Sequence, residues 1–481
     1  MRDFLEQWDG RRKNGEKISP KYDPDDPASW EGVIWIDAGE KRLFKIDLDN
    51  KYLTGTLDLS GCSFLETVNL YHNRIEKLIL EDCTGLIYCN CMSNMIHMLD
   101  VSGCLKLEQL YCLDNQLREL ALVKLPELKI VCAGNNNLIY LDISGCENLE
   151  TLVCTSNQLK NLVFKGNREL REVFCANNLL KELDLSSLKK LEVLDCSSNL
   201  LESLDVGNNF ELVKLICNNN NIKEIKGMKY HPRLEEVFCK SNSLVELNFE
   251  KCTAIKKIDC QDNELEDLIV TDCDELDELY CSSNFLSKLD LSTNTNLRIL
   301  HCDMNQLSDL DLGFAGNLTH LNCSKNNLSE LVINSTELQE VDCSYNQLQR
   351  LEIADPAKLF SLDCSYNRLT FATLPILETY TIYNYLYQDI IIIGNDGKLY
   401  VHEEVDFSAE AVIDGVRTEF RWYGVGGPVS PTTENNGNFT FGYNFIGELI
   451  YCEFTNNKFP GLVLDTTEVR VLPPAPGQKS R

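Results

Sequence analysis

Apolar residues recur along this chain with a period of 21 residues. An asparagine marks each period, and fifteen asparagines stand in register: Asn73, Asn94, Asn115, Asn136, Asn157, Asn178, Asn199, Asn220, Asn242, Asn263, Asn284, Asn305, Asn326, Asn346 and Asn367. The repeating unit reads LxxLxCxxNxLxxLxL. Residues around its cysteine alternate between apolar and polar types, which is the period of a strand with one buried face. The pattern therefore predicts one short strand in every repeat.

Neighbouring repeats have to stack, because a unit of 21 residues cannot bury its own leucines. The unit resembles that of the leucine-rich repeat family, and the match covers residues 57–374. The resemblance implies a leucine-rich repeat solenoid of 15 repeats, with a parallel β-sheet on the concave face and short irregular or 3-10 return segments. We assign residues 57–376 to this array.

A cysteine precedes the asparagine by three positions in thirteen of the fifteen repeats. Two interpretations fit this inward column: buried free thiols that pack as small hydrophobic groups, or thiols with metal or redox chemistry. We favour packing, because an odd set of thiols cannot pair fully and no CxxC pair has zinc-site spacing. A second column is expected to pack in the same way and consists of Cys62, Cys83, Cys104, Cys146, Cys252 and Cys273. This many free thiols suits a reducing compartment and disfavours oxidising secretion.

Residues 1–56 precede the repeats and differ from them in pattern. An array must end in a segment that is apolar inside and polar outside, so we expect an N-terminal cap here. The strings WEGVIW, RLFKIDL and LTGTLDL are similar to the caps of bacterial surface leucine-rich repeat proteins. That similarity favours a bacterial source, and with it a signal peptide that is not present in this chain.

The period stops after Leu374, and residues 377–472 read as strands separated by turn signals. Their spacing suggests a small β-sandwich. Trp422 and the later Cys452 resemble the central tryptophan and late-strand cysteine of an immunoglobulin-like domain, although the early partner cysteine is absent. A repeat array joined to such a sandwich is similar to the internalin-type bacterial surface proteins. The proline-rich end, 473–481, is expected to be a disordered tail.

The charge balance narrows the choice of partners. With 45 basic and 74 acidic residues, the formal net charge is −29, and long basic clusters are missing from the sequence. Such a chain repels phosphate backbones and anionic lipids, so we expect no nucleic-acid partner. No run of 18 apolar residues occurs, so we expect no membrane insertion. We expect the chain to be a monomer.

Motifs that carry chemistry are missing from the sequence. Its six histidines are scattered, and HExxH, GxSxG and phosphate-loop patterns do not occur. His301 and His320 could lie on adjacent strands, but without a third ligand they read as surface residues. Asp342 and Asp363 occupy equivalent sites of adjacent repeats, and we interpret them as solvating the array, with an acid–base pair or a calcium site as the alternatives. We therefore predict no enzyme activity, no catalytic residue, no metal and no cofactor.

The candidate ligand surface is the outward side of the concave sheet. The residue four before each asparagine projects from the middle of each strand, and flanking columns add further apolar side chains in the first five repeats. The predicted ligand-binding residues are Tyr71, Tyr88, Met92, Tyr111, Leu113, Ile130, Val153, Phe174, Ile216, Phe238 and Tyr280. The competing interpretation is that aromatic and β-branched residues are simply good strand formers. Against it, contiguous exposed apolar patches on soluble proteins usually have a use.

Taken together, these features predict a non-enzymatic protein-binding module, for adhesion or recognition, of a bacterial cell-surface or secreted protein. The partner would be a protein held on the concave sheet. Two alternatives stay open: a carbohydrate-binding surface protein, and an intracellular scaffold or effector with a cytoplasmic location.

Overall fold

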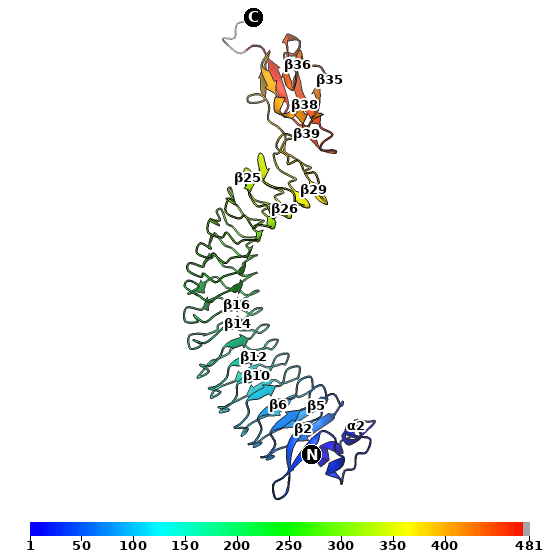
Figure 1. Cartoon of the computed structure of the whole chain (residues 1–481), viewed down its shortest axis with the longest axis vertical. Coiled ribbons are helices and arrows are strands. Elements are labelled where there is room, and N and C mark those ends of the chain that lie inside the picture. The colour runs from blue at the N-terminus through cyan, green and yellow to red at the C-terminus, as the bar shows by residue number, and fades with distance from the viewer. Residues whose placement is uncertain (475–481) are drawn as a thin grey trace. The chain divides into compact units, whose positions relative to one another are not determined.

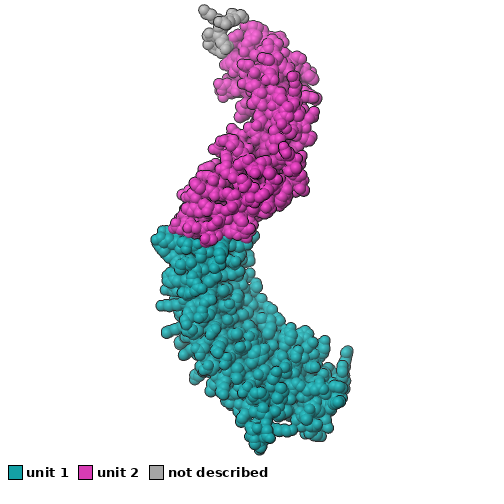
Figure 2. Space-filling view, viewed as in Figure 1, with its two compact units in different colours: residues 1–268 teal, residues 269–481 magenta. Residues whose placement is uncertain are grey.

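The computed structural model describes residues 1–474, so the tail expected at 473–481 lies, apart from its first two residues, outside the described part. The chain divides into two compact units, Met1–Leu268 and Ile269–Arg481, which are coloured separately in Figure 2. Both units contain turns of a β-solenoid. The second unit also contains a strand-rich C-terminal region.

A long sheet links the turns of the first unit (Figure 1). It begins with β1 (Val33–Asp37), which is antiparallel to β2 (Lys41–Asp47). The following strands are parallel, one per turn: β4 (Thr67–Asn69), β6 (Tyr88–Asn90), β8 (Gln109–Tyr111), β10 (Ile130–Cys132), β12 (Thr151–Val153), β13 (Glu172–Phe174), β14 (Val193–Asp195), β16 (Lys214–Ile216), β18 (Glu236–Phe238) and β20 (Lys257–Asp259). In each of these parallel strands the middle residue is buried and its two neighbours are not. The strand predicted in every repeat is therefore confirmed in this unit.

On the other side of the asparagine corners, where the chain runs back across the solenoid, many turns form a further short strand and not the irregular or 3-10 segment that was predicted. In the first unit these strands are β3 (Thr54–Asp58), β5 (Arg74–Ile79), β7 (Met98–Asp100), β9 (Glu119–Ala121), β11 (Tyr140–Asp142), β15 (Leu204–Asp205), β17 (Ile225–Lys226) and β19 (Glu246–Asn248). They form separate two- and three-stranded sheets, such as β3–β5–β7 and β9–β11. A further short strand, β21 (Asp267–Ile269), spans the division between the units.

The second unit continues the same construction with one turn more than the asparagines count. Its parallel strands are β22 (Glu278–Tyr280), β23 (Ile299–His301), β24 (His320–Asn322), β26 (Glu340–Asp342), β28 (Ser361–Asp363) and β29 (Ile382–Asn384), with β25 (Glu330–Ile333) and β27 (Arg350–Ile353) on the return side. In the last turn Gln388 replaces asparagine. Its Nε2 donates to the carbonyl oxygens of Cys364 and Tyr385, and its Oε1 accepts from the amide of Leu369. The solenoid thus has about sixteen turns.

Each asparagine holds its corner through backbone hydrogen bonds. Asn199 is typical: its Nδ2 donates to the carbonyl oxygens of Cys175, Cys196 and Ser197 at 3.0, 3.1 and 3.2 Å. Its Oδ1 accepts from the amide of Leu180 at 3.0 Å. The Asn199 side chain is buried, so water cannot take its place as the hydrogen-bond partner of these backbone groups. One amide therefore satisfies the polar groups of two successive turns.

The residue before each asparagine, or before Gln388, has a left-handed backbone, with φ between 47° and 61°. This conformation turns the chain out of the strand and directs the next side chain inward. Asparagine and aspartate are among the residues with a side chain that tolerate it best. Serine is also common here. These three residue types occupy most of these corners, as at Asn135, Ser156 and Asn177.

All 22 cysteines are free, and twenty of them are buried. The inward column is fully enclosed, as Cys196 and Cys217 show with no exposed surface. Burial raises the pKa of the Cys217 thiol to about 12. The second column does more than pack: the Sγ atoms of Cys83 and Cys104 donate to backbone carbonyl oxygens of the preceding turn at 3.1 Å.

Different elements stand at the two ends of the chain. The N-terminal segment contains α1 (Arg2–Leu5), α2 (Asn14–Ile18) and the 3-10 turn η1 (Pro27–Ser29). Phe4, Leu5 and Ile18 are buried there, and Asn14 Nδ2 donates to the carbonyl oxygen of Thr54 at 2.8 Å. These contacts hold the segment against β3, and its role as a cap stays a prediction.

The C-terminal region is built of short strands and two 3-10 turns. They are β30 (Lys398–Tyr400), β31 (Glu404–Asp406), η2 (Ser408–Glu410), β32 (Val412–Ile413), β33 (Val416–Arg417), β34 (Glu419–Gly424), β35 (Gly427–Val429), β36 (Thr433–Asn435), β37 (Asn438–Thr440), η3 (Tyr443–Phe445), β38 (Leu449–Thr455), β39 (Val463–Asp465) and β40 (Val469–Leu472). Trp422 in β34 is buried and packs edge-on against Phe441, with ring centroids 4.8 Å apart. Cys452 lies opposite Trp422 in the antiparallel β34–β38 pair. An aromatic core therefore holds these sheets together.

We expect Asn199→Ala to lower the free energy of unfolding by at least about 2 kcal/mol, because it leaves several buried backbone groups without a partner. Chemical denaturation followed by circular dichroism measures the change. Asn161→Ala, at an exposed position, is the control and should alter stability little. Equal stability of the two variants would contradict the corner role of the amide.

We expect native Cys217 to resist iodoacetamide at pH 8, because its thiol is enclosed and its raised pKa keeps it protonated. The half-buried Cys62 and Cys132 should react first, as mass spectrometry of the labelled peptides would show. Cys217→Ser should cost about 1–3 kcal/mol through the buried hydroxyl. Rapid labelling of the whole inward column, or disulfides within it, would contradict the packing interpretation.

Candidate functional site

Three side chains per turn leave the long sheet toward solvent. They stand six, four and two residues before the asparagine, and we call these positions of one unit its sheet face. The residues five and three before the asparagine point inward, as buried Leu110 and Cys112 illustrate beside half-buried Tyr111. The alternation predicted from the sequence thus determines which side chains are available to a partner.

The parallel register aligns equivalent residues of successive turns in rows. In the first unit the row four before the asparagine runs Asn69, Asn90, Tyr111, Cys132, Val153, Phe174, Asp195, Ile216, Phe238 and Asp259. Each member is the direct strand partner of the next. Side chains so aligned pack on one another across strands.

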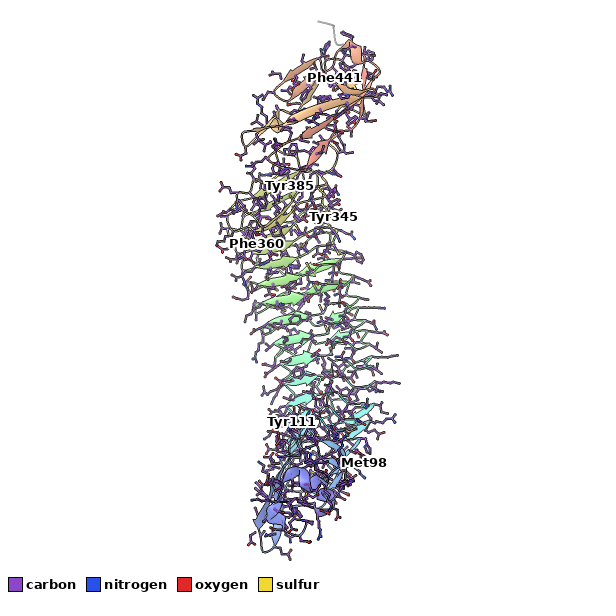
Figure 3. The ribbon with its side chains drawn as sticks, turned by 90° about the vertical axis from the view of Figure 1, so that its right-hand side faces the viewer. Met98, Tyr111, Tyr345, Phe360, Tyr385 and Phe441 are labelled. Carbon is purple, nitrogen blue, oxygen red and sulfur yellow. The ribbon has the colours of Figure 1, made fainter. Side chains whose placement is uncertain are left out.

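Aromatic side chains meet near the start of this face. The rings of Tyr88 and Tyr111 lie 5.7 Å apart, and the Tyr111 hydroxyl donates to Gln109 Oε1 at 3.2 Å. Burial raises the pKa of Tyr111, so the phenol stays neutral. Figure 3 labels Tyr111 among the strands of the long sheet. The rings are therefore held in place before any partner arrives.

Charged side chains lie on both sides of the early turns of the sheet face, and the first of them are Lys45 and Asp47 of β2, which pair with Thr67 and Asn69. The fifteen outward positions of the turns marked by Asn73 to Asn157 carry no charged side chain. Beyond them, Lys214 and Lys257 approach the ring of Phe238 at 5.1 and 5.9 Å. Burial raises the pKa of Asp259, although Lys240 and Lys257 oppose this shift. The first unit thus has an uncharged stretch of five turns with charged strands on either side.

Ten of the predicted ligand-binding residues lie on the sheet face of the first unit. Tyr71 is exposed, and the others are half-buried in the expected rows: Tyr88, Met92, Tyr111, Leu113, Ile130, Val153, Phe174, Ile216 and Phe238. The eleventh, Tyr280, belongs to the second unit, where its ring meets His301 edge-on at 5.1 Å. These residues form a surface, in which the rings of Tyr88 and Tyr111 are in contact.

His301 and His320 lie on the adjacent strands β23 and β24, two residues out of register. Burial lowers the pKa of His301, and the nearby His320 acts in the same direction while Asp303 and Glu340 oppose it. Across residues 1–474, no group of three or more histidine, cysteine or acidic side chains is arranged to hold a metal ion. Nor does any helix in that range have the length and apolar character needed to cross a membrane.

A row of tyrosines at the corners was not predicted from the sequence. Tyr345, Tyr366 and Tyr387 each stand one residue before the asparagine or Gln388, and their rings stack 4.2 and 4.7 Å apart. The signal was the same 21-residue step between Tyr366 and Tyr387 that marks the asparagines. We call these three residues the tyrosine ladder.

Grooves occur on the return side, where the short sheets are interrupted. The groove between β7 and β9 has a volume of about 540 Å3 and is lined by Met98, Arg118 and Val123 among others. Figure 3 labels Met98 on this side. Apolar and charged side chains mix there, unlike the uncharged sheet face.

Comparison with solved structures defines the fold. A domain of InlJ from Listeria monocytogenes, described as including a cysteine ladder, aligns with a TM-score of 0.51 at 21% identity over 89% of this chain and 90% of that one. A plant peptide hormone receptor, RGFR1 in complex with RGF2, aligns with a TM-score of 0.57 at 18% identity over 77% and 73%. A leucine-rich repeat protein from Bacteroides eggerthii gives 0.55 at 15% identity over 79% and 86%. The chain has the leucine-rich repeat fold.

That fold was predicted from the sequence, and the comparison confirms it. No family model matches the chain, and no curated protein matches it either. The structural neighbours are leucine-rich repeat proteins, and one of them was solved with a peptide hormone.

We expect Asp259→Asn to stabilise the protein at pH 7. The folded-state pKa of Asp259 is raised, so the folded chain binds more protons than the unfolded chain between the two pKa values, and stability falls as pH rises through that window. The gain should disappear at pH 3, where both states are protonated. Thermal unfolding at the two pH values measures it.

Asp142→Asn is the matched control with the opposite sign. Hydrogen bonds from the amide and hydroxyl of Ser144 lower the pKa of Asp142, so its carboxylate stabilises the fold above its unfolded pKa. This variant should lose stability at pH 7. A loss for Asp259→Asn as well would contradict the role of burial.

Proposed function

We propose that the chain is a non-enzymatic binding module that holds a protein partner on the sheet face of its first unit. The observation that supports this most is the uncharged run of outward positions between Thr67 and Thr155. A quarter of the whole chain is charged, so fifteen consecutive outward positions without charge stand out from the rest of the surface. Interface cores are depleted of charge and enriched in aromatic residues in the same way.

The chemistry of this surface suits a protein ligand. Tyr71, Tyr88 and Tyr111 offer large apolar area with few rotatable bonds, so little side-chain entropy is lost on binding. Their strands are part of a continuous parallel sheet, which fixes the spacing of the rings before a partner binds. Phe174, Ile216 and Phe238 extend the surface along the row. We place the energetic centre at Tyr111 and Phe174.

Finer assignments belong to the same proposal. We propose an internalin-like role in adhesion or recognition at a bacterial cell surface or in the medium, supported by the cap strings and repeats. The C-terminal region is proposed to be immunoglobulin-like; the buried Trp422 opposite Cys452, and the parallel pairing of β30 with β40, support it. Fractionation of the source cells tests the location.

We expect Tyr111→Ala combined with Phe174→Ala to weaken protein binding by about 2 kcal/mol or more, because truncation removes two central anchors. Random peptides displayed on phage and selected on the full chain provide the probes, and their affinities for the variants are measured by biolayer interferometry. The melting temperature should stay within a few degrees, since both rings are only half-buried.

The matched control removes the same residue types from the return side. Tyr140 and Phe210 are 52% and 49% exposed in the same unit, and Tyr140→Ala with Phe210→Ala should leave peptide affinity unchanged. Peptides that lose affinity for the control pair, and keep it for the Tyr111 and Phe174 pair, would move the site to the return side. No selectable peptide binder at all would argue against a protein-binding face.

A further inference from the structure

We propose that the tyrosine ladder of the second unit is a docking site for an extended, arginine-rich segment of a partner protein. The site is separate from the sheet face of the first unit and does not depend on the function proposed above. It rests on three observations: the backbone at the three tyrosines, the geometry of their rings, and the charge of the surface beside them.

Folding alone does not account for tyrosine at these corners. Tyr345, Tyr366 and Tyr387 have φ of 55°, 54° and 61°, a left-handed conformation that is unfavourable for a bulky residue. Most other corners carry serine, asparagine or aspartate. The three side chains are 48%, 40% and 64% exposed, so burial offsets little of this cost. Mutual stacking and a hydrogen bond between the hydroxyl groups of Tyr345 and Tyr366 are the stabilisation they gain within the chain.

The stack determines what a partner can touch. Its interplanar angles are 9° and 18° at centroid distances of 4.2 and 4.7 Å, so neighbouring rings cover each other's faces. A sugar ring stacks on an open aromatic face, and inner faces of the ladder are closed. Phenol oxygens and the outer face of the terminal ring remain, and a planar guanidinium can use both by donating to oxygen and stacking on the ring.

Two other tyrosines of the chain already have a cation of the chain over their rings. Tyr52 and Tyr230 are exposed and left-handed as well, with φ of 55° and 66°. Each has its own cation: the guanidinium of Arg74 lies 5.4 Å from the Tyr52 ring, and Lys251 Nζ lies 5.0 Å from the Tyr230 ring. Within residues 1–474, no lysine or arginine makes such a contact with the ladder. A partner can supply that cation.

Apart from Lys325 at the corner before Tyr345, the neighbouring surface is complementary to a basic partner. The outward positions of the six turns in the second unit include Asp303, Glu340, Asp342 and Asp363, and none of these positions is lysine or arginine. Arg368, two residues after Tyr366, is already paired with Asp389, with Nε and Oδ2 3.0 Å apart. Figure 3 labels Tyr345 and Phe360 at opposite ends of these strands, so the ladder borders one edge of the acidic face. This field attracts cations and orients them toward the rings.

The probe for the test is a fluorescein-labelled peptide of alternating arginine and glycine, ten residues long, measured by fluorescence anisotropy in 0.3 M salt. The variant is the full chain with Tyr345→Ser, Tyr366→Ser and Tyr387→Ser, which keeps the net charge and uses the residue found at other corners. We expect the affinity of the triple variant for the peptide to fall about tenfold, because cation–π contacts at partly desolvated rings are lost. The same peptide with lysine for arginine should bind the native chain more weakly.

The control chain carries Tyr52→Ser, Tyr140→Ser and Tyr230→Ser, which removes three exposed tyrosines of the first unit at the same net charge. It should bind the arginine peptide as the native chain does. If the triple ladder variant unfolds, Tyr387→Ser alone removes the terminal ring, leaves the other two stacked, and should still weaken binding. Equal affinity of native and folded ladder variants would overturn the proposal. So would ladder-dependent binding of maltohexaose or chitohexaose without any effect on the arginine peptide.

Discussion

The corner hydrogen bonds of the asparagines are the constraint on which the rest of the structure depends. A left-handed residue turns the chain out of the strand, and the next side chain then reaches the carbonyl groups of two turns, as Asn199 does. Because the amide must meet the same groups in every turn, the length of the repeat is held near 21 residues. That length keeps the strands in parallel register and places equivalent side chains in rows. The core columns and the sheet faces both follow from it.

Sequence reasoning succeeded where a residue's role repeats. The asparagine period and the alternation around Cys112 were enough to predict the strands, the buried rows and the outward positions of Tyr111 and Phe174. The last turn was not predicted, because Gln388 makes the corner hydrogen bonds there with a side chain one methylene longer than asparagine. Counting asparagines therefore ended the array one turn early. The tyrosine ladder was not predicted, because a corner residue lies outside the alternating positions of the strand. The C-terminal region has no repeating pattern, so the pairing of its strands could not be predicted from the sequence.

Charge divides the sheet faces within the two units differently. The early turns expose hydroxyl, amide, apolar and aromatic groups, whereas the turns of the second unit expose carboxylates without a lysine or arginine among them. Neither arrangement is needed for folding, because the outward rows lie outside the buried columns of leucine and cysteine. Lys129 and Glu108, paired at 2.9 Å on adjacent turns, show that unlike charges also alternate at the edge of the strands. Surface chemistry is therefore free to vary along a constant interior.

The left-handed corners are positions where the side chain can vary while the interior stays the same. A corner side chain points away from the interior and is followed by the asparagine or Gln388 that secures the turn, so its identity can change without repacking the core, although a bulky residue adopts this backbone at a cost. The chain already samples histidine, methionine, lysine and tyrosine there, at His72, Met304, Lys325 and Tyr345. Ten such sites in the first unit and six in the second form a row within each unit. New binding residues could be introduced at these corner positions by single substitutions.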